Sequence, residues 1–340
     1  MKILVRATNW IGDAVMSLPA LRTLRTLYPD AQITVLARPW VAALYLGETA
    51  IDHVVPLRGG PGLRDWAAKW QTVRTLRREQ FDLAVLFPNS FESAAVVWLA
   101  GARHRIGYAR DGRSFLLTEA ITLPQAAETP KHERFYYLEL LHRAGLLPEV
   151  PAVPEIRLEG ADAARGRGTA LFAARGVAMP VVGVSPGAAY GTAKRWLPER
   201  FAESARRLAT EIGGSTAVFG SVAERPLCEG VAIAAGGQNF AGATTLREFI
   251  DMTAACHVCL TNDSGAMHIA SALGVPSVTV FGPTDETATA PSGPAARLVR
   301  EPVDCAPCML RECPIDHRCM TRVPADRVVA EALFAIRGRC

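Results

Sequence analysis

Short apolar runs alternate with longer amphipathic segments along the whole chain. Residues 3–5 and 83–87 are continuous apolar runs, and residues 33–36 are apolar except for Thr34, which favours buried strands of a parallel sheet. Between them, residues 14–27 and 63–78 carry apolar residues at helical spacing. Strands linked by helices in this order predict a doubly wound parallel sheet, so the chain is of the α/β class.

A proline-rich stretch, residues 147–154, interrupts this alternation and favours an extended linker. After it the pattern restarts, and a chain of 340 residues fits two domains. We therefore expect one domain at 1–150, a second at 151–325 and a closing helix within 326–340. Ligands of such sheets bind at the carboxyl ends of the strands, and we expect a cleft between the two halves. The second half is expected to hold strands at 181–184, 216–219, 257–260 and 277–281 and helices at 198–208 and 224–234. A further segment, residues 246–255, precedes the strand at 257–260.

The polar run Thr-Asn-Asp-Ser-Gly-Ala-Met-His at 261–268 lies between an apolar strand and a small-residue helix. The free N–H groups and the positive dipole end of such a helix favour a phosphate. Asp263 and Ser264 are able to cap the helix, and Gly265 allows a ligand to approach the backbone closely. His268 is then either a partly buried helix residue or a group that orients a phosphate or a sugar.

Two further polar loops follow predicted strands. In the first, Asp13 comes directly after Gly12 and is either a helix-start residue or a carboxylate able to act as general base. In the second, Gly187 lets backbone N–H groups reach an anion, while Lys194 and Arg195 supply charge. Neither loop carries a dinucleotide fingerprint or a Walker A motif. A solvated surface loop is the plain alternative for the second one.

Ser221 and Glu224 follow the strand predicted at 216–219, and Thr245 lies in a loop before the next helix. All three positions are candidates for contacts to a nucleotide at the strand ends. Ordinary helix starts with capping residues explain them as well.

The composition is that of a globular protein, with 49% hydrophobic and 21% charged residues. A net charge of +4 is too small by itself to indicate nucleic acid. No apolar run reaches the roughly 20 residues that span a bilayer, and polar residues occupy the place of a signal peptide's apolar region. We therefore expect a cytoplasmic protein. The first half holds basic residues that form either a solvated face or an attraction for an anionic glycolipid and the membrane carrying it: Arg58, Arg64, Lys69, Arg74, Arg77, Arg78, Arg103, Arg105, Arg110 and Arg113.

The eight cysteines of a cytoplasmic protein are expected to be mainly reduced thiols. Cys305, Cys308, Cys313 and Cys319 have the spacing C-x2-C-x4-C-x5-C. Four thiolates complete the tetrahedral shell of a structural zinc ion. The second pair is not C-x2-C, so a loop of reduced packing thiols is the alternative.

These motifs together resemble glycosyltransferase family 9, the ADP-heptose:lipopolysaccharide heptosyltransferases, most closely those of the heptosyltransferase II type. The similarity covers essentially the whole chain. The matching residues are 6–18, 194–196, 219–221, 262–265, 267–268 and 281–284.

The resemblance implies a GT-B fold of two Rossmann-like domains and an inverting transfer that requires no cofactor. The implied donor is ADP-heptose, bound by the second half, and the implied acceptor is a heptose of the lipid A–core glycolipid, bound by the first half. By similarity Asp13 is the base and Lys194 a phosphate contact. The nucleotide-sugar loop corresponds to Asp263, Ser264, Gly265 and His268. Where some relatives have hydroxyl residues, this chain has Ala189 and Tyr190, so phosphate contacts there would come from backbone N–H groups or from Tyr190.

Other functions stay open at this point. The enzyme could be of the heptosyltransferase I type, or a GT-B enzyme with another reaction, such as a nucleotide-sugar epimerase. An epimerase needs further acid and base carboxylates and no acceptor. A third alternative is a non-catalytic protein that binds a nucleotide sugar or an anionic glycan.

Overall fold

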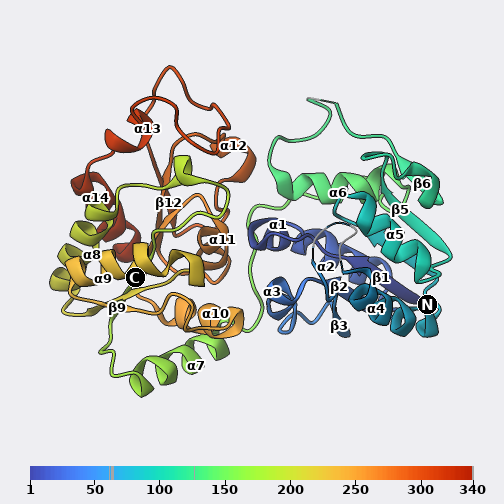
Figure 1. Cartoon of the computed structure of the whole chain (residues 1–340), viewed down its shortest axis with the longest axis horizontal. Coiled ribbons are helices and arrows are strands. Elements are labelled where there is room, and N and C mark those ends of the chain that lie inside the picture. Colours follow the sequence, from blue (N-terminus) through green and yellow to red (C-terminus); the bar gives the residue numbers. More distant parts are fainter. Residues whose placement is uncertain (61, 63–64, 126, 339–340) are drawn as a thin grey trace. The chain divides into compact units, whose positions relative to one another are not determined.

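A computed structural model describes the chain except residues 61, 63, 64, 126, 339 and 340. The chain divides into two compact units, Met1–Pro154 and Glu155–Cys340. The division falls at the end of the proline-rich stretch. Each unit is built on one six-stranded sheet whose neighbouring strands run parallel (Figure 1).

The sheet of the first unit has the strand order β3-β2-β1-β4-β5-β6. In this doubly wound order β2 and β3 are added on one side of β1, and β4, β5 and β6 are added on the other. The point between β1 and β4 is the switch point, where ligands of such sheets bind. The central strands are buried, β4 along its whole length and β1 from Ile3 onwards, as their apolar runs predict. The strands are β1 (Lys2–Arg6), β2 (Gln32–Ala37), β3 (His53–Pro56), β4 (Leu83–Leu86), β5 (His104–Tyr108) and β6 (Glu119–Ile121).

The helix predicted at 14–27 is divided at Ser17 into two shorter helices. Pro19 explains the division, because proline has no N–H to donate to the carbonyl one turn earlier. The helix predicted at 63–78 is observed from Trp66, and residues 63 and 64 lie outside the described part of the chain. The elements are α1 (Ile11–Met16), α2 (Leu18–Leu27), α3 (Pro39–Ala42), η1 (Ala43–Tyr45), α4 (Trp66–Glu79), α5 (Phe91–Leu99), η2 (Ser114–Leu116) and α6 (Glu133–Arg143).

The second sheet repeats the arrangement, with the order β12-β11-β10-β7-β8-β9. Its switch point lies between β7 and β10, which pair along Val258–Thr261 and Val182–Ser185. The strand predicted at 257–260 is observed at 258–262, so it begins one residue later and ends two residues later. Thr261 and Asn262 therefore belong to the strand and not to a turn. The strands are β7 (Val181–Ser185), β8 (Ser215–Val218), β9 (Gln238–Asn239), β10 (Val258–Asn262), β11 (Ser277–Phe281) and β12 (Ala296–Arg300).

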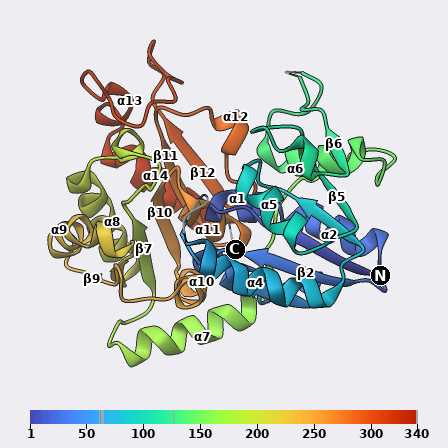
Figure 2. The same cartoon turned by 45° about the vertical axis from the view of Figure 1, so that its right-hand side comes forward.

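Helices cover both faces of this second sheet (Figure 2). On one face α8, α9 and α14 contribute to a continuous apolar core with the strands. On the other, α11 contacts β10, and α10 packs against α7 and α11. The elements are α7 (Ala161–Ala174), η3 (Thr192–Lys194), α8 (Pro198–Ile212), η4 (Val222–Glu224), α9 (Arg225–Ala235), α10 (Leu246–Ala255), α11 (Gly265–Ala272), α12 (Glu286–Thr289), α13 (Arg318–Thr321) and α14 (Ala325–Arg337).

Two of the basic residues expected on a solvated face are buried instead. Lys69 and Arg113 are 0% exposed, and each bonds to backbone oxygens of neighbouring loops. Arg64 lies outside the described residues. Within the described part of the chain, no helix is both long and apolar enough to cross a membrane.

Candidate functional site

Three loops of the second unit meet at the carboxyl ends of β7, β10 and β11. Lys194 comes from the loop after β7, and its Nζ lies 2.5 Å from Oδ2 of Asp263, which follows β10. The same oxygen accepts a 2.5 Å hydrogen bond from Oγ1 of Thr284, which follows β11. Lys194 and Asp263 are largely buried, with side chains 12% and 4% exposed. The fold therefore brings together two of the predicted site residues at the switch point.

Asn262, a residue to which the sequence alone assigns no role, holds both ends of the Lys194 loop. Its Oδ1 accepts from the backbone N–H of Trp196 at 2.9 Å. Its Nδ2 donates to the carbonyl of Pro186 at 2.7 Å. The side chain is 0% exposed, so these bonds form away from water and fix the loop firmly.

Ser264 is the N-cap residue of α11, and Gly265 is the first residue of that helix. The expectation that side chains cap the helix is wrong, because among the described residues the Ser264 side chain makes no capping bond. The Asp263 carboxylate is bonded to Lys194 and Thr284. The first N–H groups of α11 are thus left for another acceptor. His268 is buried in the first half of this helix.

Gly187, Ser221 and Glu224 also come together. Glu224 Oε2 accepts from both the N–H and the hydroxyl of Ser221, at 2.9 and 2.8 Å, which forms a capping box at η4. A Cβ added to Gly187 would lie 2.1 Å from Oε1 of Glu224, so a larger residue there would displace the Glu224 carboxylate. Burial, and after it the charge of Glu224, raise the pKa of Cys228 to about 12, although the charge of Arg195 acts to lower it. Both charges therefore lie near this thiol.

Arg195 has a buried Nε with no hydrogen-bond partner among the described residues. Thr245 is exposed and caps α10, where its hydroxyl and N–H engage Glu248 in a second capping box. Thr245 is therefore a helix-capping residue, as the alternative interpretation of the sequence predicts. It shares no hydrogen bond with the other site residues in the described interactions.

Asp13 lies in the first turn of α1, at the carboxyl end of β1 in the first unit. Its charge acts on residues of α6: burial raises the pKa of the Glu133 carboxyl, and Asp13 raises it further. Burial and the charge of Asp13 also hold the pKa of Tyr137 well above its ordinary value. Two carboxyl groups therefore lie near each other beside the switch point of this sheet, and a pair of this kind has coupled protonation states.

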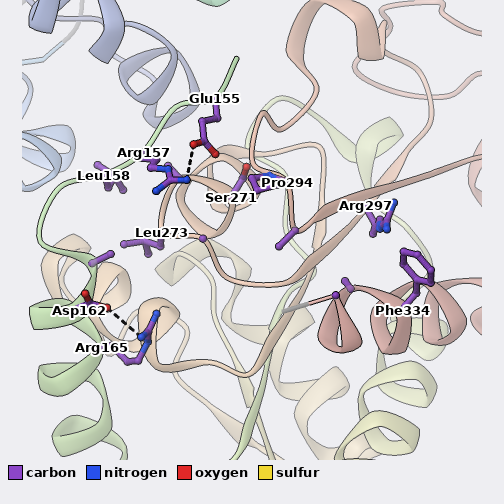
Figure 3. Close-up of a pocket in the computed structure, with 16 residues that line it drawn as sticks. Glu155, Arg157, Leu158, Asp162, Arg165, Ser271, Leu273, Pro294, Arg297 and Phe334 are labelled. Carbon is purple, nitrogen blue, oxygen red and sulfur yellow. Dashed lines mark hydrogen bonds and ion pairs between the residues drawn. The ribbon is translucent and has the colours of Figure 1, made fainter. Parts of the chain in front are cut away.

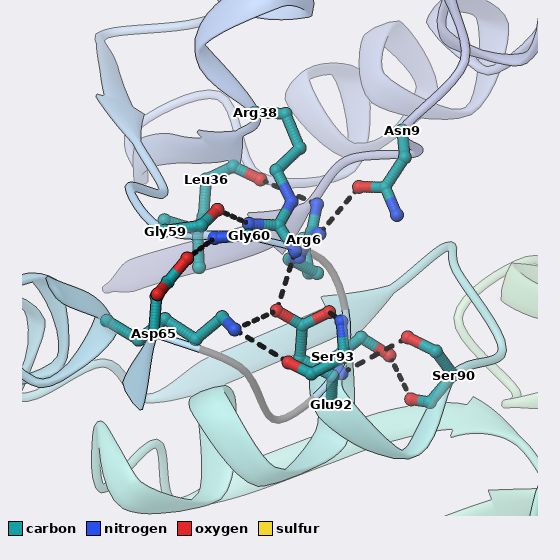
Figure 4. A network of polar contacts seen from close by, with 12 residues as sticks. Arg6, Asn9, Leu36, Arg38, Gly59, Gly60, Asp65, Ser90, Glu92 and Ser93 are labelled. Atoms are coloured by element: carbon teal, nitrogen blue, oxygen red, sulfur yellow. Dashed lines mark hydrogen bonds and ion pairs between the residues drawn. The ribbon is translucent and has the colours of Figure 1, made fainter. Parts of the chain in front are cut away.

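A buried polar network supports the same edge of the first sheet (Figure 4). Arg6 donates to Oδ1 of Asn9 at 2.7 Å, in the loop that leads to Asp13. Arg38 and Lys69 lie 2.6 and 3.2 Å from Oε1 of Glu92. Burial lowers the pKa of Arg6 to about 10, and the neighbouring charge of Arg38 lowers it as well. Of these buried cations, Arg6 connects the network to the loop before Asp13 through its bond to Asn9.

Cys305, Cys308, Cys313 and Cys319 lie within reach of one another's charges, and burial with those charges raises the pKa of Cys319 to about 11. Even so, no three or more His, Cys, Asp or Glu side chains of the described residues are arranged to hold a metal ion. Residues 305–319, hereafter the cysteine segment, form the orange-to-red loop that leads into and includes the start of α13 in Figures 1 and 2.

A cavity of about 550 Å³ lies elsewhere in the second unit (Figure 3). It is lined by the start of α7, the end of α11 and the start of β12. Two of its arginines are in ion pairs, Arg157 with Glu155 at 2.6 Å and Arg165 with Asp162 at 3.2 Å, and Arg297 lies over the ring of Phe334. The cavity opens at the amino ends of the strands, and it includes none of the predicted site residues.

Two Rossmann-like units with polar groups at both switch points are the architecture of GT-B glycosyltransferases. Residues 69–318 match the signature of glycosyltransferase family 9 (heptosyltransferase). Lipopolysaccharide heptosyltransferase 2 of Escherichia coli K12 is 33% identical over 311 residues, 88% of each chain. Lipooligosaccharide heptosyltransferase 2 of Haemophilus ducreyi is 31% identical over 97% of this chain and 98% of its own.

The solved structure of E. coli ADP-heptose lps heptosyltransferase II superposes with a TM-score of 0.83, at 28% identity, over 100% of this chain and 99% of that one. The fold class is therefore GT-B, as the sequence predicts, and the chain is a glycosyltransferase. It belongs to glycosyltransferase family 9, the heptosyltransferases.

Proposed function

We propose that the protein transfers L-glycero-D-manno-heptose from ADP-heptose to an inner-core heptose of lipopolysaccharide, with inversion at the anomeric carbon. The acceptor hydroxyl gives its proton to Asp13 and forms the new C–O bond. The bond from the anomeric carbon to the diphosphate breaks, and ADP leaves with the electron pair. A single carboxylate base suffices for such a direct displacement.

The observation that carries this proposal is the ion pair of Lys194 and Asp263 at the β7/β10 switch point. A leaving diphosphate needs fixed positive groups, and Lys194 and the N-terminal N–H groups of α11 at Ser264 and Gly265 supply them. Arg195 adds a second cation. The remaining donor contacts in this proposal are Gly187, Ser221, Glu224, Thr245, Asp263 and His268.

The first unit supplies Asp13 and, in this proposal, binds the acceptor. Glu133 stands beside Asp13 and holds its own proton more readily than an ordinary glutamate, since its pKa is raised. After burial, the negative charge of Asp13 is the second cause of that raised pKa.

We infer that the enzyme works at the cytoplasmic surface of the inner membrane, where a lipid A–core acceptor is anchored. The first unit has an aromatic cavity of about 360 Å³ that includes Trp98 and Phe115, which are 49% and 74% exposed. Exposed arginines Arg74, Arg77 and Arg103 belong to the same unit. Aromatic side chains beside basic ones favour an anionic lipid surface. Co-sedimentation with anionic vesicles tests this inference.

In this proposal the charge on the diphosphate is met by side chains and a helix end, so no cofactor takes part. A structural zinc ion at Cys305, Cys308, Cys313 and Cys319 stays a prediction from their spacing. Elemental analysis of the purified protein measures it.

We favour an acceptor of the heptosyltransferase II type, which already carries one heptose, because both relatives described above are heptosyltransferases 2. The test is release of ADP from ADP-heptose in EDTA, with truncated lipopolysaccharides ending in no heptose or in one heptose. We expect release only with the acceptor that carries one heptose. Release with the heptose-free core alone would identify a type I enzyme. Tight ADP binding without release on either core would contradict a transferase.

A further inference from the structure

The cysteine segment contacts the loop that carries Lys194. The N–H of Ala193 donates to the carbonyl of Arg311 at 3.0 Å, and a ring nitrogen of His317 lies 2.7 Å from the carbonyl of Ala193. A Cβ added to Gly191 would lie 2.2 Å from the Arg311 carbonyl oxygen. The cysteine segment therefore bonds both backbone polar groups of Ala193, directly before Lys194: the Arg311 carbonyl engages its N–H, and the His317 ring engages its carbonyl.

Tyr190 connects the same two segments through its side chain. Its hydroxyl donates to the carbonyl of Met309 at 2.8 Å, so it is engaged within the protein. Its ring meets two cations: Nζ of Lys194 lies 4.8 Å, and the guanidinium carbon of Arg311 5.2 Å, from the ring centroid. Cations favour the negative face of an aromatic ring. The Lys194 ammonium group therefore lies over the face of the Tyr190 ring.

The backbone of Met309 also bonds to the loop after β11, which carries Thr284. Its N–H donates to the carbonyl of Pro283 at 2.8 Å, directly before Thr284, which bonds Asp263. Met309 has φ +57°, the left-handed region, which costs a non-glycine residue roughly 1 kcal/mol. Such a conformation persists only where the surroundings impose it.

We propose that Tyr190, Met309 and Arg311 are positioning residues that hold Lys194 in place for the donor's diphosphate. The cysteine segment is then the support of the donor site, although it lies more than a hundred residues from Lys194 in the chain. The proposal rests on the proposed function, because it requires that Lys194 bind the diphosphate.

The flexible side chain of lysine explains why such support matters. Lys194 is paired with Asp263, and a diphosphate must share its ammonium group with that carboxylate. A four-carbon side chain free to turn loses entropy on binding a phosphate, whereas one already held against a ring loses less. Removing the Tyr190 ring, or its hydrogen bond to Met309, therefore weakens donor binding and leaves the acceptor's binding unchanged.

The test compares Tyr190→Phe and Tyr190→Leu with the wild type in the full chain, by calorimetric titration with ADP. Tyr190→Phe keeps the ring and removes only the bond to Met309, so we expect the Kd for ADP to rise about fivefold. Tyr190→Leu removes the ring as well, and we expect a rise of about twentyfold or more. The donor KM rises in parallel, while the acceptor KM stays unchanged.

Two controls separate positioning from general damage. Leu310→Ala removes an exposed side chain of the cysteine segment that contributes to none of the contacts described above, so ADP affinity stays at the wild-type value. Tyr28→Leu in the first unit makes the same chemical change away from the site and leaves ADP affinity unchanged. Melting temperatures confirm that every variant is folded at the titration temperature.

Arg311 provides a rescue experiment. Arg311→Leu removes the second cation from the ring, and we expect ADP affinity to fall about threefold, whereas Arg311→Lys restores most of it. Wild-type affinity in Tyr190→Leu would overturn the proposal, and so would an equal loss in Leu310→Ala and Tyr190→Phe. A wild-type protein that does not bind ADP would overturn the proposed function itself, and this inference with it.

Discussion

Nζ of Lys194 lies 2.5 Å from Oδ2 of Asp263, across 69 positions of the chain, at the switch point of the second sheet. Neither residue is able to stay buried as a charge without the other. The pair therefore has two functions that a single variant does not separate: it stabilises the unit, and it holds an ammonium group where a diphosphate is expected.

We predict that Lys194→Met loses both stability and donor binding. It leaves the Asp263 carboxylate buried without its cation, which costs about 3 kcal/mol and lowers the Tm by about 6–12 °C. The Kd for ADP rises at least tenfold, because a charge-assisted contact to phosphate is lost.

The double variant Lys194→Met with Asp263→Asn separates the two effects. Its Tm returns most of the way to the wild-type value, since no unpaired charge remains, while ADP affinity stays low. Recovery of ADP affinity in the double variant would show that Lys194 acts only on stability.

A second prediction concerns the cysteines. Cys305 and Cys308 are exposed, whereas burial raises the pKa of Cys228 to about 12 and that of Cys319 to about 11. Because only thiolates react quickly, N-ethylmaleimide at pH 7.5 should label the first two within minutes and spare the other two. Mass spectrometry of peptides measures the pattern. Protection of Cys305 and Cys308 that EDTA abolishes would instead indicate bound zinc.

Hydrophobic patterning predicts the buried central strands well, because parallel strands covered on both faces are continuous apolar runs. Residues 277–281 coincide with β11, and the segment 246–255 forms α10. The edge strands β6 and β12 escape prediction, since an edge strand is half solvated and its sequence is mixed. Helix α7 escapes because its 14 residues include two glycines and show little amphipathic pattern.

The candidate site is predicted less completely than the fold. Motif spacing points to Lys194 and Asp263, but only the fold shows that they form an ion pair. Asn262 and Thr284 lie within quoted motifs, yet their bonds to distant loops have no local signal. The contacts of Tyr190 with residues 309–311 are of the same kind, because they join segments that are far apart in the sequence.

A third prediction follows from the raised pKa of Glu133. Its pKa is higher in the folded than in the unfolded protein, so the folded state binds more protons between the two values. The free energy of unfolding contributed by this group therefore falls as the pH rises between these two pKa values. Above the higher value the buried charge destabilises the folded protein by its full amount. Glu133→Gln should raise the Tm at pH 8 and change it little at pH 4. An equal shift at both pH values would attribute the effect to packing.

The fourth prediction tests Asp13 as the base. Asp13→Asn keeps the size and polarity of the side chain and removes its ability to accept a proton, so the transfer rate should fall about 10²- to 10⁴-fold. The Kd for ADP should stay unchanged, because the donor contacts come from the second unit. Asp30→Asn, an exposed aspartate of the same unit, is the matched control and should keep full activity. A loss of ADP affinity in Asp13→Asn equal to its loss of rate would place Asp13 in donor binding, and Glu133 would then be the carboxylate to examine as the base.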